Sequence, residues 1–165
     1  MEYFIIFDKT YKMTDYRIYK AQTEDFPEIL KLIKELALFE KAPEKVINTI
    51  DQMNNEKDLF RCLVVKDQNR KIIGFALYFY AYFTWVGKSL YLDDLYVKPE
   101  YRNKGIGTTL LKEIFKIAKK ENCKRLRWQV LNWNTDAIIL YNRSGAFIDN
   151  DWSNCDFDYE QIKNF

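Results

Sequence analysis

The sequence predicts a single mixed α/β (α+β) domain with a mostly antiparallel sheet flanked by helices. Hydrophobic residues make up 48% and aromatic residues 17% of the 165 residues, which is enough for one substantial core in a chain too short for two. Three consecutive strand-like segments between residues 60 and 97 are joined by short turns, which predicts an antiparallel meander. A dinucleotide-binding unit would instead alternate parallel strands and helices from its start.

The beginning of this region predicts a strand followed by an amphipathic helix. The strand covers residues 16–21. The pattern Asp25-Phe-Pro-Glu28 predicts a capping box with proline in the first helical turn. Apolar residues then recur at helical spacing to about Phe39, and Pro43 ends the helix.

A second capping pattern, Thr49-Ile-Asp-Gln52, predicts a short helix before the meander. The meander strands are expected over residues 60–66, 71–83 and 89–97. Beyond Pro99 the expected elements are a helix over about 107–120, a strand over 124–131, a helix over 135–143 that Gly145 ends, and closing strands around 146–148 and 155–159.

We expect residues 1–15 to form an N-terminal extension and residues 16–165 to form the domain. Met13 is a plausible start, so residues 1–12 are either an extra edge strand or a result of start-site choice. The apolar segment 2–7 is short and has no basic residue ahead of it, which argues against a secretion signal. With no apolar run of transmembrane length, a cytoplasmic location is expected.

The composition excludes several kinds of chemistry. The chain has no histidine, which removes Ser-His-Asp triads, Cys-His dyads and His-ligated zinc. Its three cysteines are far apart and form no CxxC pair, so we expect no metal site. The net charge of +2, with acids and bases interspersed, does not predict binding to nucleic acid.

The loop Arg102-Asn-Lys-Gly-Ile-Gly107 carries the first functional signal. Two of the chain's five glycines lie here, between a strand and a helix. Glycine lets the backbone turn tightly and approach a ligand, and the helix start presents free N–H groups and a positive dipole end. This pattern indicates an anion site, and the alternative is an ordinary strand-to-helix turn.

This loop and the strand before it, Tyr91-Leu-Asp-Asp-Leu-Tyr-Val97, resemble the acetyl-CoA signature of the GNAT acetyltransferase superfamily. Trp133-Asn134 and the segment from Ala137 to Ala146 resemble its second cofactor motif. Leu38-Phe-Glu-Lys41, Thr84-Trp85 with Gly87, and Pro99-Glu-Tyr-Arg102 resemble the diamine acetyltransferase branch, and within it the thialysine N-acetyltransferases, relatives of spermidine/spermine acetyltransferase. The resemblance covers about residues 16–152.

The resemblance implies a GNAT fold with splayed central strands, acetyl-CoA as co-substrate and a homodimer. It implies that the cofactor is bound by three groups of residues: Leu95, Tyr96 and Val97 through the main chain; Arg102, Asn103, Lys104, Gly105, Ile106, Gly107 and Thr108 in the loop; and Asn134 with Ala137. Asn134 is also suited to cap the helix that follows it.

Acetyl transfer to an amine requires that the amine lose a proton, and at pH 7 this costs about 4–5 kcal/mol for a lysine-like amine. The resemblance assigns Asp93 to the position of the family's glutamate base. Because aspartate is one methylene shorter, Asp93 is either a base, a water relay or only a charge that holds the cationic substrate. Strand alternation sends Asp94 to the opposite face unless a bulge intervenes.

Tyr141 corresponds to the family's acid position, where a phenol protonates the departing thiolate. A tyrosine of ordinary pKa, about 10, is protonated at pH 7 and can donate without further adjustment.

The resemblance also implies an acceptor site. Phe39 and Glu40 match positions that line the family's amine pocket. Arg127 stands where the polyamine enzymes carry histidine, and a permanent cation there would repel a long polycation and hold a carboxylate. This favours a thialysine or lysine-analogue substrate over spermine. Trp85, Trp133 and Trp152 either wall the site or are ordinary packing aromatics.

Two other functions remain open from the sequence. One is acetylation of a protein N-terminus or lysine, which requires an open peptide groove, whereas the bulky segment 78–85 predicts a walled pocket. The other is a non-catalytic acetyl-CoA-binding domain, against which Tyr141 argues.

Overall fold

The computed structural model describes residues 15–165, so the suggestions made above for residues 1–12 lie outside the described part. The chain divides into two compact units, one up to Gln129 and the other from Val130 to Phe165. Over residues 15–165, no helix has the length and apolar character needed to cross a membrane.

The first unit is built on one five-stranded sheet in the order β1-β2-β3-β4-β5. The strands are β1 (Tyr16–Lys20), β2 (Arg61–Asp67), β3 (Ile72–Phe83), β4 (Gly87–Val97) and β5 (Arg125–Arg127). Neighbouring strands are antiparallel except for the parallel pair β4–β5. The predicted meander is therefore confirmed, and the fold is a mixed, mostly antiparallel α/β structure.

The fifth strand is much shorter than the predicted range 124–131. It pairs with β4 only through Ser89–Tyr91, and regular structure ends at Arg127. A strand persists only where a neighbour takes up its backbone hydrogen bonds, and among the described residues β5 has none beyond this point.

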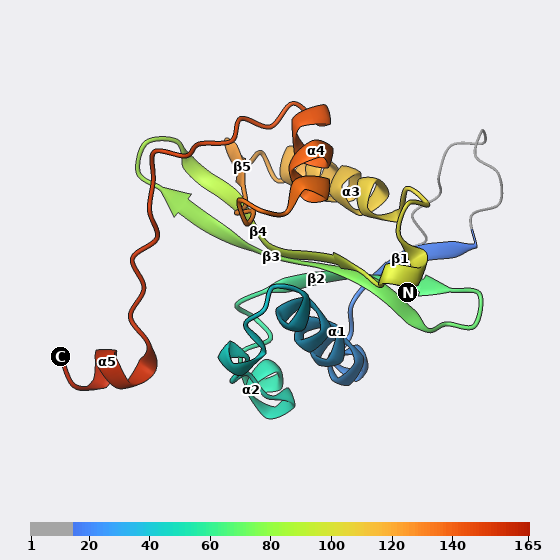
Figure 1. Cartoon of the computed structure of the whole chain (residues 1–165), viewed down its shortest axis with the longest axis horizontal. Helices are drawn as coiled ribbons and strands as arrows, with labels where there is room; N and C mark the ends of the chain where they lie inside the picture. Colours follow the sequence, from blue (N-terminus) through green and yellow to red (C-terminus); the bar gives the residue numbers. More distant parts are fainter. Residues whose placement is uncertain (1–14) are drawn as a thin grey trace. The chain divides into compact units, whose positions relative to one another are not determined.

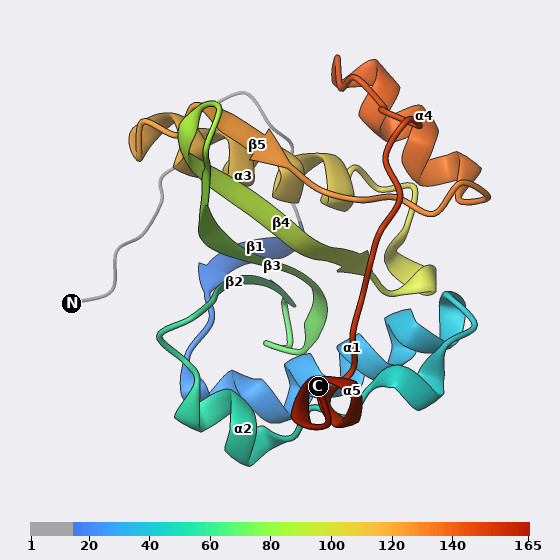
Figure 2. The ribbon, with the colours of Figure 1, turned by 90° about the vertical axis from the view of Figure 1, so that its left-hand side faces the viewer.

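Helices cover both faces of this sheet (Figures 1 and 2). On one face lie α1 (Phe26–Phe39) and α2 (Ile50–Asn55), and on the other lies α3 (Ile106–Lys120). Successive side chains of a strand point to opposite faces of the sheet. On β2, Cys62 and Val64 therefore share one face, where they join the cluster against α1 and α2. That cluster consists of Phe26, Ile29, Leu30, Leu32, Met53, Cys62, Val64, Ile72, Phe75 and Tyr96.

The first helix begins near the expected residue but not with the expected capping box. The Asp25 side chain does not cap α1; its carboxylate instead accepts from Lys66 Nζ at 2.6 Å and from the Gln22 backbone N–H at 3.1 Å. Lys66 lies on β2 with little exposure, so the ion pair joins the start of α1 to the sheet. The prediction for Thr49 holds in part, since its Oγ1 accepts from the Gln52 backbone N–H at 3.1 Å.

A bulge in β4 changes which side chains share a face. Leu77 of β3 lies opposite Asp94 and Tyr78 lies opposite Leu92, so Asp93 is an extra residue without a partner position. Before the bulge, Tyr91 stacks on Phe79 at 5.1 Å, and after it the Tyr96 hydroxyl donates to Glu35 of α1 at 3.1 Å. The odd-numbered residues before the bulge and the even-numbered residues after it therefore face α1.

The second unit contains α4 (Thr135–Arg143), which has the predicted bounds, and α5 (Tyr159–Lys163). The closing strands predicted around 146–148 and 155–159 are wrong. Within residues 15–165 these segments pair with no strand, and Asp158 instead starts α5 through a reciprocal capping box with Gln161, with hydrogen bonds of 2.8 and 2.9 Å. The sequence Asp158-Tyr-Glu-Gln161 carried this signal.

We predict that Gly74→Ala destabilises the first unit by about 1–3 kcal/mol. A Cβ at Gly74 would lie 2.8 Å from the Tyr96 carbonyl oxygen, and because that atom is backbone, β3 and β4 must move apart. Urea unfolding measures the change. Gly107→Ala is the control, since its Cβ would lie 3.7 Å from Leu95 Cδ2 and stability should be retained. Equal stability of both variants and the wild type would contradict this account of the packing.

Candidate active site

Two adjacent carboxylates lie in a cavity of about 440 Å³ in the first unit. Asp93 and Asp94 supply the acids from β4, and Asn48 adds a polar group from the loop before α2. The other lining residues are apolar: Ile33, Met53, Leu59, Phe60, Leu77 and Phe79. The β4 bulge places both acids on one face of the sheet. Without a bulge, strand alternation would have sent Asp94 to the opposite face.

The cavity makes both acids weaker than usual. Burial raises the pKa of Asp94 to about 7, with further contributions from the negative charges of Asp93 and Glu40. Asp93 lines the cavity and is exposed, yet the surrounding protein is dense enough that desolvation raises its pKa as well. Because like charges this close oppose each other's ionisation, Asp94 is the member of the pair whose pKa lies near neutral pH, and it suits proton exchange with an amine.

The end of α1 borders this acidic region. Glu40 follows the last residue of α1, and burial raises the pKa of its carboxyl. Neither Glu40 nor Phe39 lines the cavity itself, but the charge of Glu40 reaches Asp94. The predicted acceptor residues Phe39 and Glu40 and the candidate base Asp93 therefore belong to one region of the first unit.

Beyond Tyr91, β4 has a strand neighbour on one side only among the residues that the structure describes, since β5 pairs no further than this residue. The Lys98 backbone N–H donates to Ile73 of the β3 side at 3.0 Å, and the Tyr96 carbonyl also faces β3. Because main-chain groups alternate along a strand, those of Leu95 and Val97 point to the open edge. An acyl oxygen or a pantetheine amide can bind there.

The loop from Arg102 to Thr108 joins this edge to α3. Asn103 and Gly105 both have positive φ, 60° and 78°, and Gly105 is the residue before the helix. The first helical bond runs from the Thr109 N–H to the Gly105 carbonyl at 2.9 Å. The N–H groups of Ile106, Gly107 and Thr108 therefore have no acceptor within the helix. With no acidic residue in the first turn and an exposed Lys104 nearby, this end of α3 can bind a phosphate group.

Arg102 does not extend into solvent beside Lys104. Its Nε donates to the Val97 carbonyl at 2.9 Å, and its guanidinium lies 5.1 Å from the ring centre of Phe39 and 5.5 Å from that of Tyr96. Arg127 also stacks on an aromatic ring, that of Phe83, at 5.2 Å. It lies opposite Tyr91 on β5, is exposed, and does not line the acidic cavity.

The remaining predicted residues belong to the second unit and are described within it. Asn134 caps α4, because its Oδ1 accepts from the Ala137 N–H at 3.3 Å. Tyr141 is the buried residue of this helix. In the same unit Trp133 is 47% and Trp152 70% exposed, and in the first unit Trp85 is 81% exposed, so neither Trp85 nor Trp152 is a packing aromatic.

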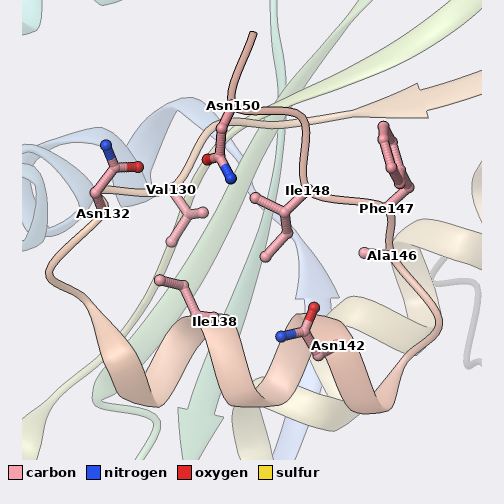
Figure 3. Close-up of a pocket in the computed structure, with 8 residues that line it drawn as sticks. All are labelled: Val130, Asn132, Ile138, Asn142, Ala146, Phe147, Ile148 and Asn150. Atoms are coloured by element: carbon pink, nitrogen blue, oxygen red, sulfur yellow. The ribbon is translucent and has the colours of Figure 1, made fainter.

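A separate hollow of about 630 Å³ lies within the second unit (Figure 3). Figure 3 shows Val130, Ile138, Asn142, Ile148 and Asn150 around it, on α4 and on the segments before and after that helix. It contains no carboxylate and none of the residues predicted for the site, so we assign it no part in the chemistry.

Sequence reasoning missed the contribution of Asp94, of Asn48 and of the Phe79–Tyr91 stack at 5.1 Å. The doubled acid in Leu92-Asp-Asp-Leu95 was a visible signal, because two charges in succession interrupt an apolar strand. Strand periodicity alone assigned them to opposite faces. Over residues 15–165, no group of three or more side chains is arranged to hold a metal ion.

We predict that Asp94→Asn stabilises the protein increasingly as pH rises. The Asp94 carboxyl has a pKa of 3.8 in the unfolded chain and about 7 in the folded one, so the folded state loses stability between these values. A neutral amide avoids this loss, and the stabilisation should grow by on the order of 2 kcal/mol between pH 5 and pH 8. Urea unfolding at both pH values measures it, with exposed Asp58→Asn as the control. A pH-independent difference would contradict the assignment.

Known proteins are similar to this chain in sequence and in fold. Residues 16–146 match the acetyltransferase (GNAT) family. Thialysine N-epsilon-acetyltransferase of Mus musculus is 36% identical over 145 residues, which cover 81% of this chain and 85% of that protein. Spermidine/spermine N(1)-acetyltransferase-like protein 1 of Homo sapiens is 37% identical over 144 residues, covering 81% of this chain and 21% of that protein.

Among solved structures, an integron cassette protein from the mobile metagenome of V. cholerae has the same fold. It aligns with a TM-score of 0.72 at 21% identity and covers 92% of this chain and 97% of that one. The family match extends over most of the chain, and the mouse relative is aligned over most of its own length. The chain therefore belongs to the acetyltransferase (GNAT) family and is an enzyme that acetylates amines.

Proposed function

We propose that this enzyme transfers the acetyl group of acetyl-CoA to a primary amine of a small molecule by direct attack. The observation that carries the proposal is the carboxylate pair Asp93–Asp94, which lies in a largely apolar cavity at the point where β4 loses its neighbour β5. A cationic amine is attracted to the acids, and the adjacent open edge of β4 offers main-chain donors for the acyl group.

Acetyl-CoA is the donor that suits the loop between β4 and α3. The pyrophosphate would bind the free N–H groups of Ile106, Gly107 and Thr108, with Asn103 and Gly105 providing the turn and Lys104 a positive charge. The pantetheine arm would bind along Leu95–Val97, and Asn134 and Ala137 would contact it from α4. Nothing but small side chains at residues 105 and 107 would allow the backbone to approach the phosphates.

The chemistry follows from the raised pKa values. The amine arrives protonated and transfers its proton to the Asp93–Asp94 pair, directly or through water, and its lone pair then attacks the thioester carbonyl carbon. Donors on β4 stabilise the oxyanion that forms. The new carbon–nitrogen bond leaves a second proton on a positively charged nitrogen, and this proton passes to water as the oxyanion collapses to the amide. When the carbon–sulfur bond breaks, the electron pair stays on sulfur, Tyr141 supplies the proton that makes the free thiol, and solvent returns a proton to the tyrosinate.

We predict that Tyr141→Phe lowers kcat by about 10²–10⁴-fold while the dissociation constant for CoA stays nearly unchanged. The phenyl ring preserves the packing of this buried position and removes only the proton donor. Thiol release gives the rate, and calorimetry gives the CoA affinity. Unchanged turnover would eliminate Tyr141 as the acid.

The acceptor we favour is thialysine or a similar lysine analogue. The mouse relative is a thialysine N-epsilon-acetyltransferase, which supports this substrate class. Phe79 lines the cavity and stacks on Tyr91, and Arg127 lies opposite Tyr91 on β5. An amine bound at the acids can therefore direct a carboxylate toward the exposed guanidinium, whereas a polyamine would direct a second positive charge toward it.

We predict that kcat/KM for thialysine exceeds that for spermidine by tenfold or more, measured by thiol release across a panel of amines. Arg127→Gln should lower kcat/KM for thialysine more than that for spermidine, because only thialysine has a carboxylate that can pair with the guanidinium. The matched control is Arg125→Gln, whose guanidinium also stacks on Phe83, at 5.4 Å. A clear preference for spermidine would reject the lysine-like substrate but not amine acetylation.

The cavity also argues against a protein substrate, since its volume of about 440 Å³ and its apolar lining, which includes Phe60, Leu77 and Phe79, suit a small amine. We further propose that residues 16–165 act as one acetyltransferase domain, located in the cytoplasm and assembled as a homodimer. Light scattering tests the last point, because a monomer would have a mass of 20.0 kDa.

A further inference from the structure

The side chain of Arg102 lies on the α1 side of the sheet, away from α3, whose N-terminus ends the phosphate-binding loop. Its guanidinium lies between the rings of Phe39 and Tyr96, at 5.1 and 5.5 Å from their centres. The Tyr96 hydroxyl bonds to Glu35 of α1, which fixes this ring on the α1 face. The α3 helix covers the opposite face (Figures 1 and 2).

Several hydrogen bonds fix the residues around Arg102. The Glu35 carboxylate accepts from the Tyr96 hydroxyl at 3.1 Å and from Lys98 Nζ at 2.8 Å. The Arg102 Nε donates to the Val97 carbonyl at 2.9 Å. Arginine suits both kinds of contact, because its planar guanidinium stacks on aromatic faces while its Nε–H donates in the plane of the guanidinium.

These contacts connect the end of α1, beside the acidic cavity, to the loop before α3. Phe39 is the last residue of α1 and precedes Glu40, whose charge raises the pKa of Asp94 in the acidic cavity. Arg102 begins the loop that continues through Gly105 into α3. A displacement of Phe39 therefore reaches the loop through one side chain.

We propose that Arg102 is a positioning residue, held between Phe39 and Tyr96, that fixes the cofactor loop and ties it to the acceptor end of α1 without binding phosphate itself. The inference rests on the proposed binding of acetyl-CoA to this loop. It follows that Phe39, a residue on the acceptor side, controls affinity for the cofactor. It also follows that lysine, which keeps the charge of Arg102, cannot replace it.

The test is CoA binding measured by calorimetry on the full chain without amine, for Arg102→Lys, Arg102→Gln, Phe39→Leu and the double variant Arg102→Lys/Phe39→Leu. Each single variant should raise the dissociation constant about threefold to tenfold, the range expected for loss of a stacked cation. The double variant should bind no more weakly than the weaker single variant, because both changes remove the same contact. Arg125→Lys, which alters an arginine stacked on Phe83, is the control and should bind CoA normally.

Two results would overturn the proposal. Wild-type affinity in Arg102→Lys together with weak binding in Arg102→Gln would mean that only the charge of Arg102 matters, as in direct phosphate contact. Wild-type affinity in Phe39→Leu would mean that α1 does not hold the loop.

Steady-state kinetics separates positioning from general damage to the fold. In Arg102→Lys, KM for acetyl-CoA should rise while kcat stays within about twofold, since no group that touches the reacting atoms has changed. A fall in kcat with no change in KM would count against positioning.

Amide hydrogen exchange of the free protein provides a readout that does not depend on the cofactor. Residues 102–107 should exchange faster in Arg102→Lys and Phe39→Leu than in the wild type, and equal rates would reject the proposal. If the wild type binds no CoA, the proposed function fails, and the exchange rates still decide whether Arg102 holds the loop.

Discussion

The extra residue at Asp93 decides which face every later side chain of β4 occupies. A strand alternates with a period of two, so one inserted residue reverses the assignment of all that follow. Here it turns Tyr96 toward α1, where the ring joins the core cluster and bonds to Glu35, and turns Leu95 toward Gly107 of α3. The acid pair, the position of the Tyr96 ring against Arg102 and the contact between Leu95 and Gly107 all depend on this bulge.

The bulge also sets the electrostatic character of the site. Two carboxylates on one face of an apolar cavity cost the folded state stability, because burial and mutual repulsion both oppose ionisation. The same two effects raise the pKa of Asp94 to about 7, where a carboxyl can exchange a proton near neutral pH. In a chain without histidine, the Asp94 carboxyl therefore has a pKa in the range that imidazole covers elsewhere.

The first unit contains several contacts between cationic side chains and aromatic rings. Arg102 is stacked between Phe39 and Tyr96, and Lys104 lies over the ring of Tyr101 at 5.3 Å. In the loop, charge is therefore divided between a side chain used for structure and one that remains exposed for a ligand. The pattern Arg-x-x-Gly-x-Gly does not distinguish these roles, because both residues are basic and lie two positions apart.

The sequence by itself determined features that depend on neighbours along the chain. The Asn134 cap and Gly145 indicated the bounds of α4, the short turns indicated the meander, and the glycines indicated the loop before α3. Only the tertiary structure decided features that depend on distant partners. Asp25 bonds to Lys66 instead of capping α1, Asp94 shares a face with Asp93 because of its register against β3, and the predicted closing strands lack a neighbour to pair with. Local patterns specify local hydrogen bonds, whereas register and long-range pairing are fixed by contacts that no short segment contains.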